Sequence, residues 1–340
     1  MSALLEVRGL SVALPTARGW VRPVNDISFE IAAGETLGLV GESGSGKTML
    51  SLALLGLLPV GARVSGEALL SADPGSASRA STSGKNLAAL RESAWPGVRG
   101  GEIAMVFQEP MTSLNPVMSV GAQISEAITA HDSKARGAVL HERVIGALQR
   151  ASVPEPEVRA KQFPHQLSGG LRQRVMIAMA LAAGPRLLIA DEPTTALDVT
   201  VQKQVLGLLD QLRREMRLGM LFITHDLGVV AQVADRVAVM YTGRIVECGP
   251  SREVLTRPAH PYTQGLLAAS PTLKRGQLRP IPGAVPQLSA VPPGCTFAPR
   301  CAWRQEECTA RLPDLRVTPG DSTRPDLAHA ARCILVGVAE

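Results

Sequence analysis

The stretch Gly41-Glu42-Ser43-Gly44-Ser45-Gly46-Lys47-Thr48 determines how the rest of the chain is interpreted. It follows an apolar run, residues 37–40, and precedes a helix-like segment, residues 49–58. A GxxxxGK(S/T) pattern between a strand and a helix is typical of a loop that binds phosphate groups, whereas a Gly/Ser-rich turn would not require that context. The glycines let successive backbone N–H groups point inward. Lys47 is predicted to reach the β- and γ-phosphates of a nucleotide, and Thr48 to ligate Mg²⁺.

Composition limits the class of protein. The chain has 340 residues, 45% of them hydrophobic, which favours one large domain with a smaller appendage. The net charge of +5 suits an anionic ligand or membrane face, but no Lys/Arg run is dense enough to indicate nucleic-acid binding. Residues 1–14 carry charges within their apolar pattern, so they do not read as a signal peptide, and the run 49–60 is too short to span a bilayer. We therefore expect a soluble cytoplasmic protein.

Upstream and downstream of the loop, the pattern alternates between strand and helix. Residues 4–7 and 24–31 alternate apolar and polar side chains, as half-buried strands do. Residues 102–107 predict a strand that ends at Gln108, and residues 117–151 have the periodicity of an inserted helical subdomain. Residues 71–86 are rich in Ser, Gly and Ala and predict a solvated loop.

An adenine base needs an aromatic face on which to stack, and Trp20 is the aromatic residue in the right neighbourhood of the chain for that role. Trp20 is either that stacking residue or an ordinary surface residue, and the sequence leaves both interpretations open.

A second glycine motif opens a predicted helix that runs to about residue 182. Ser168 is a suitable N-cap, and Gly169 and Gly170 expose backbone N–H groups at the positive end of the helix. By itself, this segment predicts a second and weaker anion site.

Acidic residues follow the buried strand 187–190, at the sheet edge where α/β proteins place their chemistry. Asp191 is suited to hold Mg²⁺, and Glu192 to act as a base or polariser toward an attacking water; a solvated acidic turn is the alternative. Asp198 precedes a predicted helix, residues 199–216. A predicted strand, residues 220–224, follows this helix and ends at His225. His225 is either structural or a contact to the phosphate or the water.

The order of these motifs resembles the ATPase subunit of ABC transporters over residues 1–250, with residues 117–182 as the helical and signature subdomain. Leu171 and Thr195 are minor departures from the pattern. The resemblance implies an α/β P-loop NTPase core with an antiparallel β subdomain and an inserted helical subdomain, plus a loop-rich C-terminal extension. It also implies that two such domains hold ATP between the P-loop of one and Ser168-Gly169-Gly170, with Asp198 nearby, of the other. The implied catalytic residues are Glu192, His225 and Gln108, with Thr48, Gln108 and Asp191 on Mg²⁺.

Three further segments are similar to the oligopeptide/dipeptide/nickel importer branch of that family: residues 111–116, residues 260–263 and the tail from residue 281 to residue 301. This resemblance implies peptide import at the cytoplasmic face of the cell membrane. Its implied partners are a second, similar but distinct ATPase, two permeases that dock near residues 108–116, and an extracytoplasmic solute-binding protein. The alternatives are nickel or another small solute, and a soluble ABC ATPase of DNA repair or translation. A P-loop kinase or GTPase would have no use for the Leu-Ser-Gly-Gly segment at residues 167–170.

Four of the five cysteines cluster near the C-terminus: Cys295, Cys301, Cys308 and Cys333. Four thiolates on a loop-rich segment can ligate zinc or an iron–sulfur cluster, and the absence of CxxC spacing favours a [4Fe–4S] cluster, as in members of the importer branch. The alternative is four unliganded thiols. Cys248 stands apart and is expected to be a small buried residue.

Overall fold

The computed structural model describes residues 3–17, 19–72, 84–108, 113–195, 197–270, 280–318 and 328–336. The chain divides into two compact units. The first comprises Met1–Leu4, Ala32–Glu35 and Leu90–Leu221, and the second comprises Leu5–Ile31, Thr36–Ala89 and Phe222–Glu340. Strand β8 (Gly219–Thr224) crosses the division between them.

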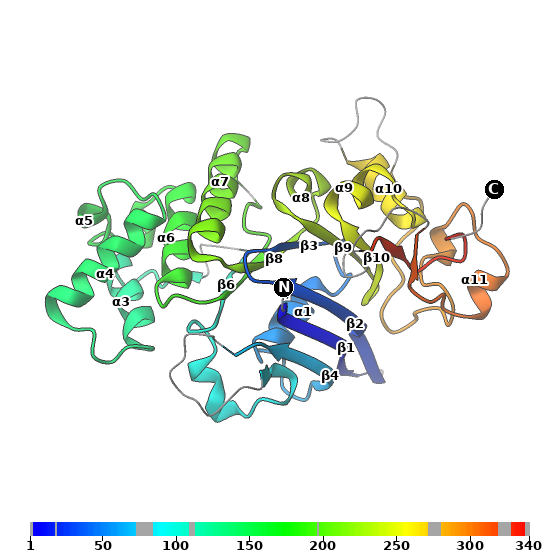
Figure 1. The fold of residues 1–340 in the computed structure, drawn as a ribbon, viewed down its shortest axis with the longest axis horizontal. Helices are drawn as coiled ribbons and strands as arrows, with labels where there is room; N and C mark the ends of the chain where they lie inside the picture. Colours follow the sequence, from blue (N-terminus) through cyan, green and yellow to red (C-terminus); the bar gives the residue numbers. More distant parts are fainter. Residues whose placement is uncertain are drawn as a thin grey trace. The chain divides into compact units, whose positions relative to one another are not determined.

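The second unit contains an antiparallel sheet built from the N-terminal part of the chain (Figure 1). Its order is β2-β1-β4-β5, formed by β2 (Gly19–Ala32), β1 (Ala3–Thr16), β4 (Arg63–Leu70) and β5 (Lys85–Asn86). Leu5 of β1 lies opposite Leu70 of β4, and both side chains are fully buried. The alternation that predicted half-buried strands therefore gives this sheet its apolar face, and the predicted antiparallel β subdomain is confirmed.

The same unit contains the strand that leads into the glycine loop. Strand β3 (Thr36–Val40) is buried along its whole length and runs parallel to β9 (Arg236–Tyr241), with Val40 beside Val239. Strand β10 (Arg244–Pro250) pairs antiparallel with β9, and β12 (Ala330–Ala331) and β11 (Arg316–Val317) follow beyond it. The helices of this unit are α1 (Lys47–Leu54), α8 (Leu227–Val233), α9 (Ser251–Thr256), α10 (Pro261–Ala269) and α11 (Glu307–Ala310).

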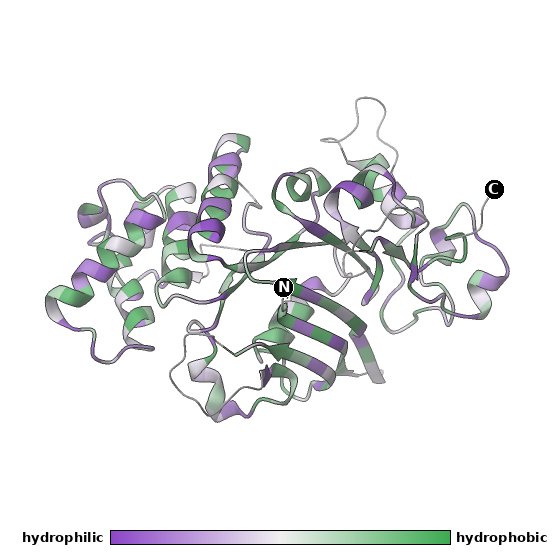
Figure 2. Ribbon diagram, viewed as in Figure 1, coloured by the Kyte–Doolittle hydropathy of each residue, from purple (hydrophilic) through white to green (hydrophobic). Residues whose placement is uncertain are grey.

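The first unit is dominated by helices. Strands β6 (Ile103–Val106) and β7 (Leu187–Asp191) run parallel, with Val106 beside Ala190. The helices are α3 (Val120–Thr129), α4 (Gly137–Arg150), α5 (Pro156–Arg159), α6 (Gly169–Leu181) and α7 (Val199–Met216). Helix α6 packs against α3, α4, α7 and β6. Hydrophilic and hydrophobic bands alternate along α7 (Figure 2), because one face of this helix is buried and the other is exposed.

The predicted elements compare closely with the observed ones. Helix α7 has the predicted bounds, and the helical segment 117–151 consists of α3 and α4. Helix α1 ends at Leu54 rather than near residue 58. Of the predicted loop 71–86, residues 73–83 lie outside the described residues, and Lys85–Asn86 form β5. Among the described helices, none has both the length and the apolar composition that crossing a bilayer would need.

Candidate nucleotide-binding site

The glycine loop between β3 and α1 has a backbone that only glycine adopts easily. Gly44 and Gly46 have φ values of +79° and +106°, in the left-handed region. A Cβ at Gly46 would overlap the carbonyl oxygen of Pro23, and a Cβ at Gly41 would overlap that of Met240. Glycine is therefore required at both positions by space as well as by backbone conformation, and the loop closes tightly around the start of α1.

The lysine of the motif is held inside this loop. Lys47 is only 6% exposed, and its Nζ donates to the carbonyl oxygens of Gly41 at 2.8 Å and of Glu42 at 3.1 Å, with Ser45 Oγ at 3.4 Å. Ser45 is also tied to the turn after β9, because its carbonyl accepts the N–H of Gly243 at 2.8 Å. The loop thus presents one buried ammonium group at the N-terminus of a helix, and both features favour an anionic ligand. The donor groups fit the phosphates of a nucleotide, with the exposed Thr48 hydroxyl in the next position.

The second glycine motif forms the start of α6 as predicted. The Ser168 side chain accepts the N–H of Leu171 at 3.4 Å, so it is the N-cap of the helix. Ser168 and Gly169 are exposed, and a Cβ at Gly170 would lie 2.8 Å from Val201 Cγ1 in α7. Gly170 therefore lets α6 approach α7 closely, while the helix tip keeps an exposed positive end.

The acidic pair lies at the end of β7. Asp191 is the last residue of the strand and is 3% exposed. Glu192 follows the strand and has a φ of +48°, an uncommon conformation for a residue with a side chain. Glu192 Oε2 accepts two hydrogen bonds, from Gln108 Nε2 at 3.2 Å and from Thr195 Oγ1 at 2.9 Å. The first unit therefore brings two of the predicted catalytic residues, Gln108 and Glu192, into direct contact.

Thr195 is a hydrogen-bond partner of Glu192 that sequence reasoning missed. It is noticeable in the sequence only as a departure from the family pattern, and nothing in the sequence shows that its hydroxyl fixes the Glu192 carboxylate. Asp198 caps α7 by accepting the N–H of Val201 at 2.9 Å. His225 is exposed at the end of β8, and Asp226 beside it caps α8.

Trp20 lies in β2 and is 47% exposed, with the guanidinium of Arg63 4.2 Å from its ring centroid. A cation already stacks on the indole, so the face offered to a base is shared with Arg63. The interpretation of Trp20 as the adenine-stacking residue stays a prediction.

The proposed docking segment of residues 108–116 is described only in part, since residues 109–112 lie outside the described residues.

The C-terminal extension contains a buried polar centre beside β10. The Glu247 side chain is fully buried and accepts the backbone N–H groups of Ala259 at 2.7 Å and His260 at 2.9 Å, with His329 Nε2 at 2.6 Å. Burial lowers the pKa of His260 to about 4, and the Glu247 charge, which raises this pKa, offsets only part of the effect. The neutral ring accepts the N–H of Tyr262 through Nδ1 at 3.0 Å and thereby caps α10.

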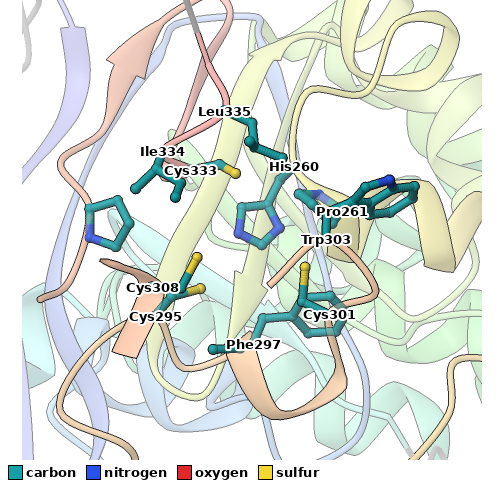
Figure 3. A pocket seen from close by; sticks show the side chains of 12 residues that line it. His260, Pro261, Cys295, Phe297, Cys301, Trp303, Cys308, Cys333, Ile334 and Leu335 are labelled. Carbon is teal, nitrogen blue, oxygen red and sulfur yellow. The ribbon is translucent and has the colours of Figure 1, made fainter. Parts of the chain in front are cut away.

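The four clustered cysteines line one pocket with His260, Phe297 and Trp303 (Figure 3). However, within the described part of the chain no three or more His, Cys, Asp or Glu side chains are arranged to hold a metal ion. The thiols line an apolar pocket, and burial raises the pKa of Cys295 to about 11. The predicted [4Fe–4S] cluster at Cys295, Cys301, Cys308 and Cys333 therefore has no support. Cys248 is half-buried in β10, not fully buried as expected.

Comparison with known proteins identifies the family. A family model described as ABC transporter matches residues 24–195, and a protein of Brucella ovis named for peptide import and ATP binding is 48% identical over 97% of this chain and 96% of its own length. The chain belongs to the ABC transporter family. A second family model, the C-terminal region of oligopeptide/dipeptide transporters, matches residues 246–308 of this ABC transporter protein. The dipeptide transport ATP-binding protein DppD of Bacillus subtilis is 44% identical to it over 98% of this chain and 95% of DppD.

Solved structures agree with this assignment. The ATP-binding cassette MJ0796, in a dimeric post-hydrolysis state bound to ADP and Pi, has a TM-score of 0.61 to this ABC transporter protein, with 25% identity over 73% of this chain and 99% of the cassette. The cbiO1 protein from Clostridium perfringens, part of the ABC transporter complex cbiONQ, has a TM-score of 0.61 and 27% identity over 76% of this chain and 92% of its own. The P-loop ABC ATPase fold predicted from the sequence is confirmed.

Proposed function

We propose that this chain is the ATP-binding subunit of an ABC importer, and that it hydrolyses ATP to drive transport of dipeptides and oligopeptides across the cytoplasmic membrane. One observation carries the choice of cargo: residues 246–308 match the C-terminal region of oligopeptide and dipeptide transporters, and near-full-length relatives are named for peptide import. Within this proposal, residues 1–250 are the ATPase domain, with 117–182 as its helical and signature subdomain, and residues 251–340 are the extension.

The roles of individual residues follow from their chemistry. The N–H groups of residues 41–48 and the Lys47 ammonium group would bind the phosphates of ATP, and Thr48, Gln108 and Asp191 would hold Mg²⁺. Bound Mg²⁺ supplies charge neutralisation at the phosphates. Glu192, held by Gln108 and Thr195, directs a water toward the γ-phosphate, and His225 contacts the phosphate or that water.

The partners follow from the same proposal. A second ATPase chain, similar but distinct, contributes its counterparts of Ser168 and Asp198 to the nucleotide held by the glycine loop of this chain. In turn, Ser168 and Asp198 of this chain contribute to the nucleotide held by the loop of the second chain. A dimeric cassette bound to ADP and Pi among the similar solved structures supports such pairing. Two permeases and an extracytoplasmic solute-binding protein complete the importer, and the chain is peripheral at the cytoplasmic face of the membrane.

Uptake by cells tests the proposal. A strain lacking the native gene is supplied with wild-type chain, with Glu192→Gln, or with Glu215→Gln as a matched control on the exposed face of α7. We expect accumulation of labelled dipeptide with the wild type and the control, and loss of uptake with Glu192→Gln. Dependence of Ni²⁺ uptake, but not of dipeptide uptake, on the wild-type gene would contradict the choice of cargo. Uptake of neither would contradict the transport role.

A further inference from the structure

The C-terminal extension makes direct contact with the glycine loop at Glu42. Arg300 Nη1 donates to Glu42 Oε2 at 2.6 Å, and Arg300 Nη2 donates to Glu42 Oε1 at 3.0 Å. This is a two-point contact between a planar guanidinium group and a carboxylate, which fixes orientation as well as distance. The backbone N–H of Glu42 also donates to the hydroxyl of Tyr262 at 2.8 Å. The extension therefore holds both the side chain and the backbone of the loop's second residue.

The arginine is itself fixed on the extension side. Its side chain is 4% exposed, and its remaining N–H groups reach the carbonyl oxygens of Pro282 at 3.0 Å and Ile281 at 3.4 Å and the hydroxyl of Tyr241 at 3.4 Å. Each of the five guanidinium N–H groups thus has an acceptor. An arginine held in this way cannot follow Glu42 if the loop shifts, so the contact opposes movement of the loop.

Aromatic packing makes this anchor rigid. The Tyr241 and Tyr262 rings have centroids 4.5 Å apart, and Phe297 lies 5.4 Å from each of them. Tyr241 and Tyr262 are fully buried and Phe297 is 3% exposed. Burial raises the pKa of Tyr262, so its phenol stays neutral and accepts the Glu42 N–H. The three rings join the strand β9, the start of α10 and the segment that carries Arg300 into one packed cluster.

The contact continues from Glu42 to the phosphate-binding lysine. The peptide whose N–H Tyr262 holds joins Gly41 to Glu42, and its carbonyl oxygen, that of Gly41, accepts a hydrogen bond from Lys47 Nζ at 2.8 Å. The carbonyl oxygen of Glu42 also accepts from Lys47 Nζ, at 3.1 Å, so the residue that the extension holds is flanked by the two carbonyl groups that position the Lys47 ammonium group. We propose that Arg300, together with Tyr262, is a positioning residue of the nucleotide site: the extension holds Glu42 so that Lys47 and the loop are preorganised for the phosphates. This inference rests on the proposed ATP-binding function, and it gives the extension a role in nucleotide affinity.

Opposite charge effects make the proposal testable. By simple electrostatics, neutralising Glu42 removes a negative charge near a polyphosphate and should strengthen binding, whereas neutralising Arg300 should weaken it. If the contact preorganises the loop, both changes weaken binding, and making both together costs no more than one alone. The sign of the Glu42→Gln effect therefore separates positioning from bulk charge.

The experiment measures the Kd of the full chain for a fluorescent ATP analogue with Mg²⁺, in Arg300→Gln, Glu42→Gln and the double variant. The matched control is Arg311→Gln, which removes an exposed ion pair with Glu307 elsewhere in the extension. We expect the Kd to rise about tenfold in each of the three variants, within the range typical of coupled sites, and to stay unchanged in the control. Arg300→Lys, which keeps the charge but loses the fork, should fall between wild type and Arg300→Gln.

Three results would overturn the proposal. The first is an unchanged Kd in Arg300→Gln, and the second is tighter binding by Glu42→Gln. The third is a double variant whose fold-increase in Kd equals the product of the fold-increases of the two single variants. If Arg300→Gln fails to fold, Glu42→Gln decides, because it breaks the same contact at a partly exposed position. Failure of the wild type to bind the analogue would instead contradict the proposed function, and this inference with it.

Discussion

Replacing Gly46 by alanine tests whether the conformation of the glycine loop, and not only its composition, creates the site. The added methyl group meets two obstacles. Gly46 has a φ of +106°, where a residue with a side chain is strained by about 1–2 kcal/mol. The Cβ would also overlap the carbonyl oxygen of Pro23 and lie 2.7 Å from Met240 Cε. The carbonyl group of Pro23 is backbone and cannot move aside as a flexible side chain can. Overpacking therefore adds about 1–3 kcal/mol to the loss of unfolding free energy.

Gly44 supplies the matched control. It has a φ of +79°, and a Cβ there would have no other atom within 4 Å. Gly44→Ala should therefore lower the free energy of unfolding by about 1–2 kcal/mol through backbone strain alone. For Gly46→Ala, the two contributions together predict a loss of roughly 2–5 kcal/mol.

Urea unfolding of the two full-length variants, followed by tryptophan fluorescence and circular dichroism, measures the difference. The same samples, titrated with a fluorescent ATP analogue and Mg²⁺, should show that Gly46→Ala also loses nucleotide binding, because α1 begins directly after this residue. Equal unfolding free energies for the two variants would refute the reasoning, since the clash with Pro23 would then have no energetic consequence.

Three further predictions concern the Glu192 carboxylate and the extension. Thr195→Val should lower the ATP turnover of the assembled complex about three- to tenfold with little change in KM, since Glu192 loses a hydrogen bond. The control Thr200→Val, at the exposed threonine of α7, should leave the turnover unchanged. Because the pKa of His260 falls from 6.5 to about 4 on folding, lowering the pH from 6.5 to 5 should remove about 2 kcal/mol of stability, measured by urea unfolding; His260→Asn, which keeps a helix cap, should flatten this dependence. Glu247→Ala should lower the unfolding free energy by about 3 kcal/mol, because the N–H groups of His260, which is buried, and Ala259, which is half-buried, lose their acceptor; an unchanged thermal midpoint would contradict this.

Most of the fold could be predicted because its signals are local. The GxxxxGK(S/T) pattern requires strand, loop and helix in sequence, and β3, the loop and α1 have that order. Helix α7 begins at Val199 and ends at Met216, as predicted, and Asp198 caps it. The features that the sequence did not show depend on contacts between distant segments. Strand β12 extends the sheet beside β10, although its pairing partner is more than eighty residues earlier in the chain.

The candidate site also combines residues that local sequence patterns indicate with contacts between distant segments that they do not. The proposed phosphate-binding residues are recognisable because their spacing between a strand and a helix indicates their chemistry. The contact of Arg300 with Glu42 joins residues 258 positions apart, and no periodicity or motif spacing reports such a pair. The [4Fe–4S] prediction has no support for a related reason, since proximity in sequence does not fix where sulfur atoms point. Cys295 and Cys308 are linked through their backbone, at 2.7 Å from N to O, and their side chains line an apolar pocket.

The most direct test of the central claim is a single measurement on the importer rebuilt in liposomes from this chain, its companion ATPase, two permeases and the binding protein. Release of phosphate and uptake of labelled dipeptide are followed together, with Mg²⁺ and ATP on the side of the ATPases. The account predicts that both occur with the wild-type chain and that both are lost with Glu192→Gln, while the variant still binds the nucleotide. Dipeptide uptake that continues at the wild-type rate with Glu192→Gln, or in the absence of ATP, would contradict it.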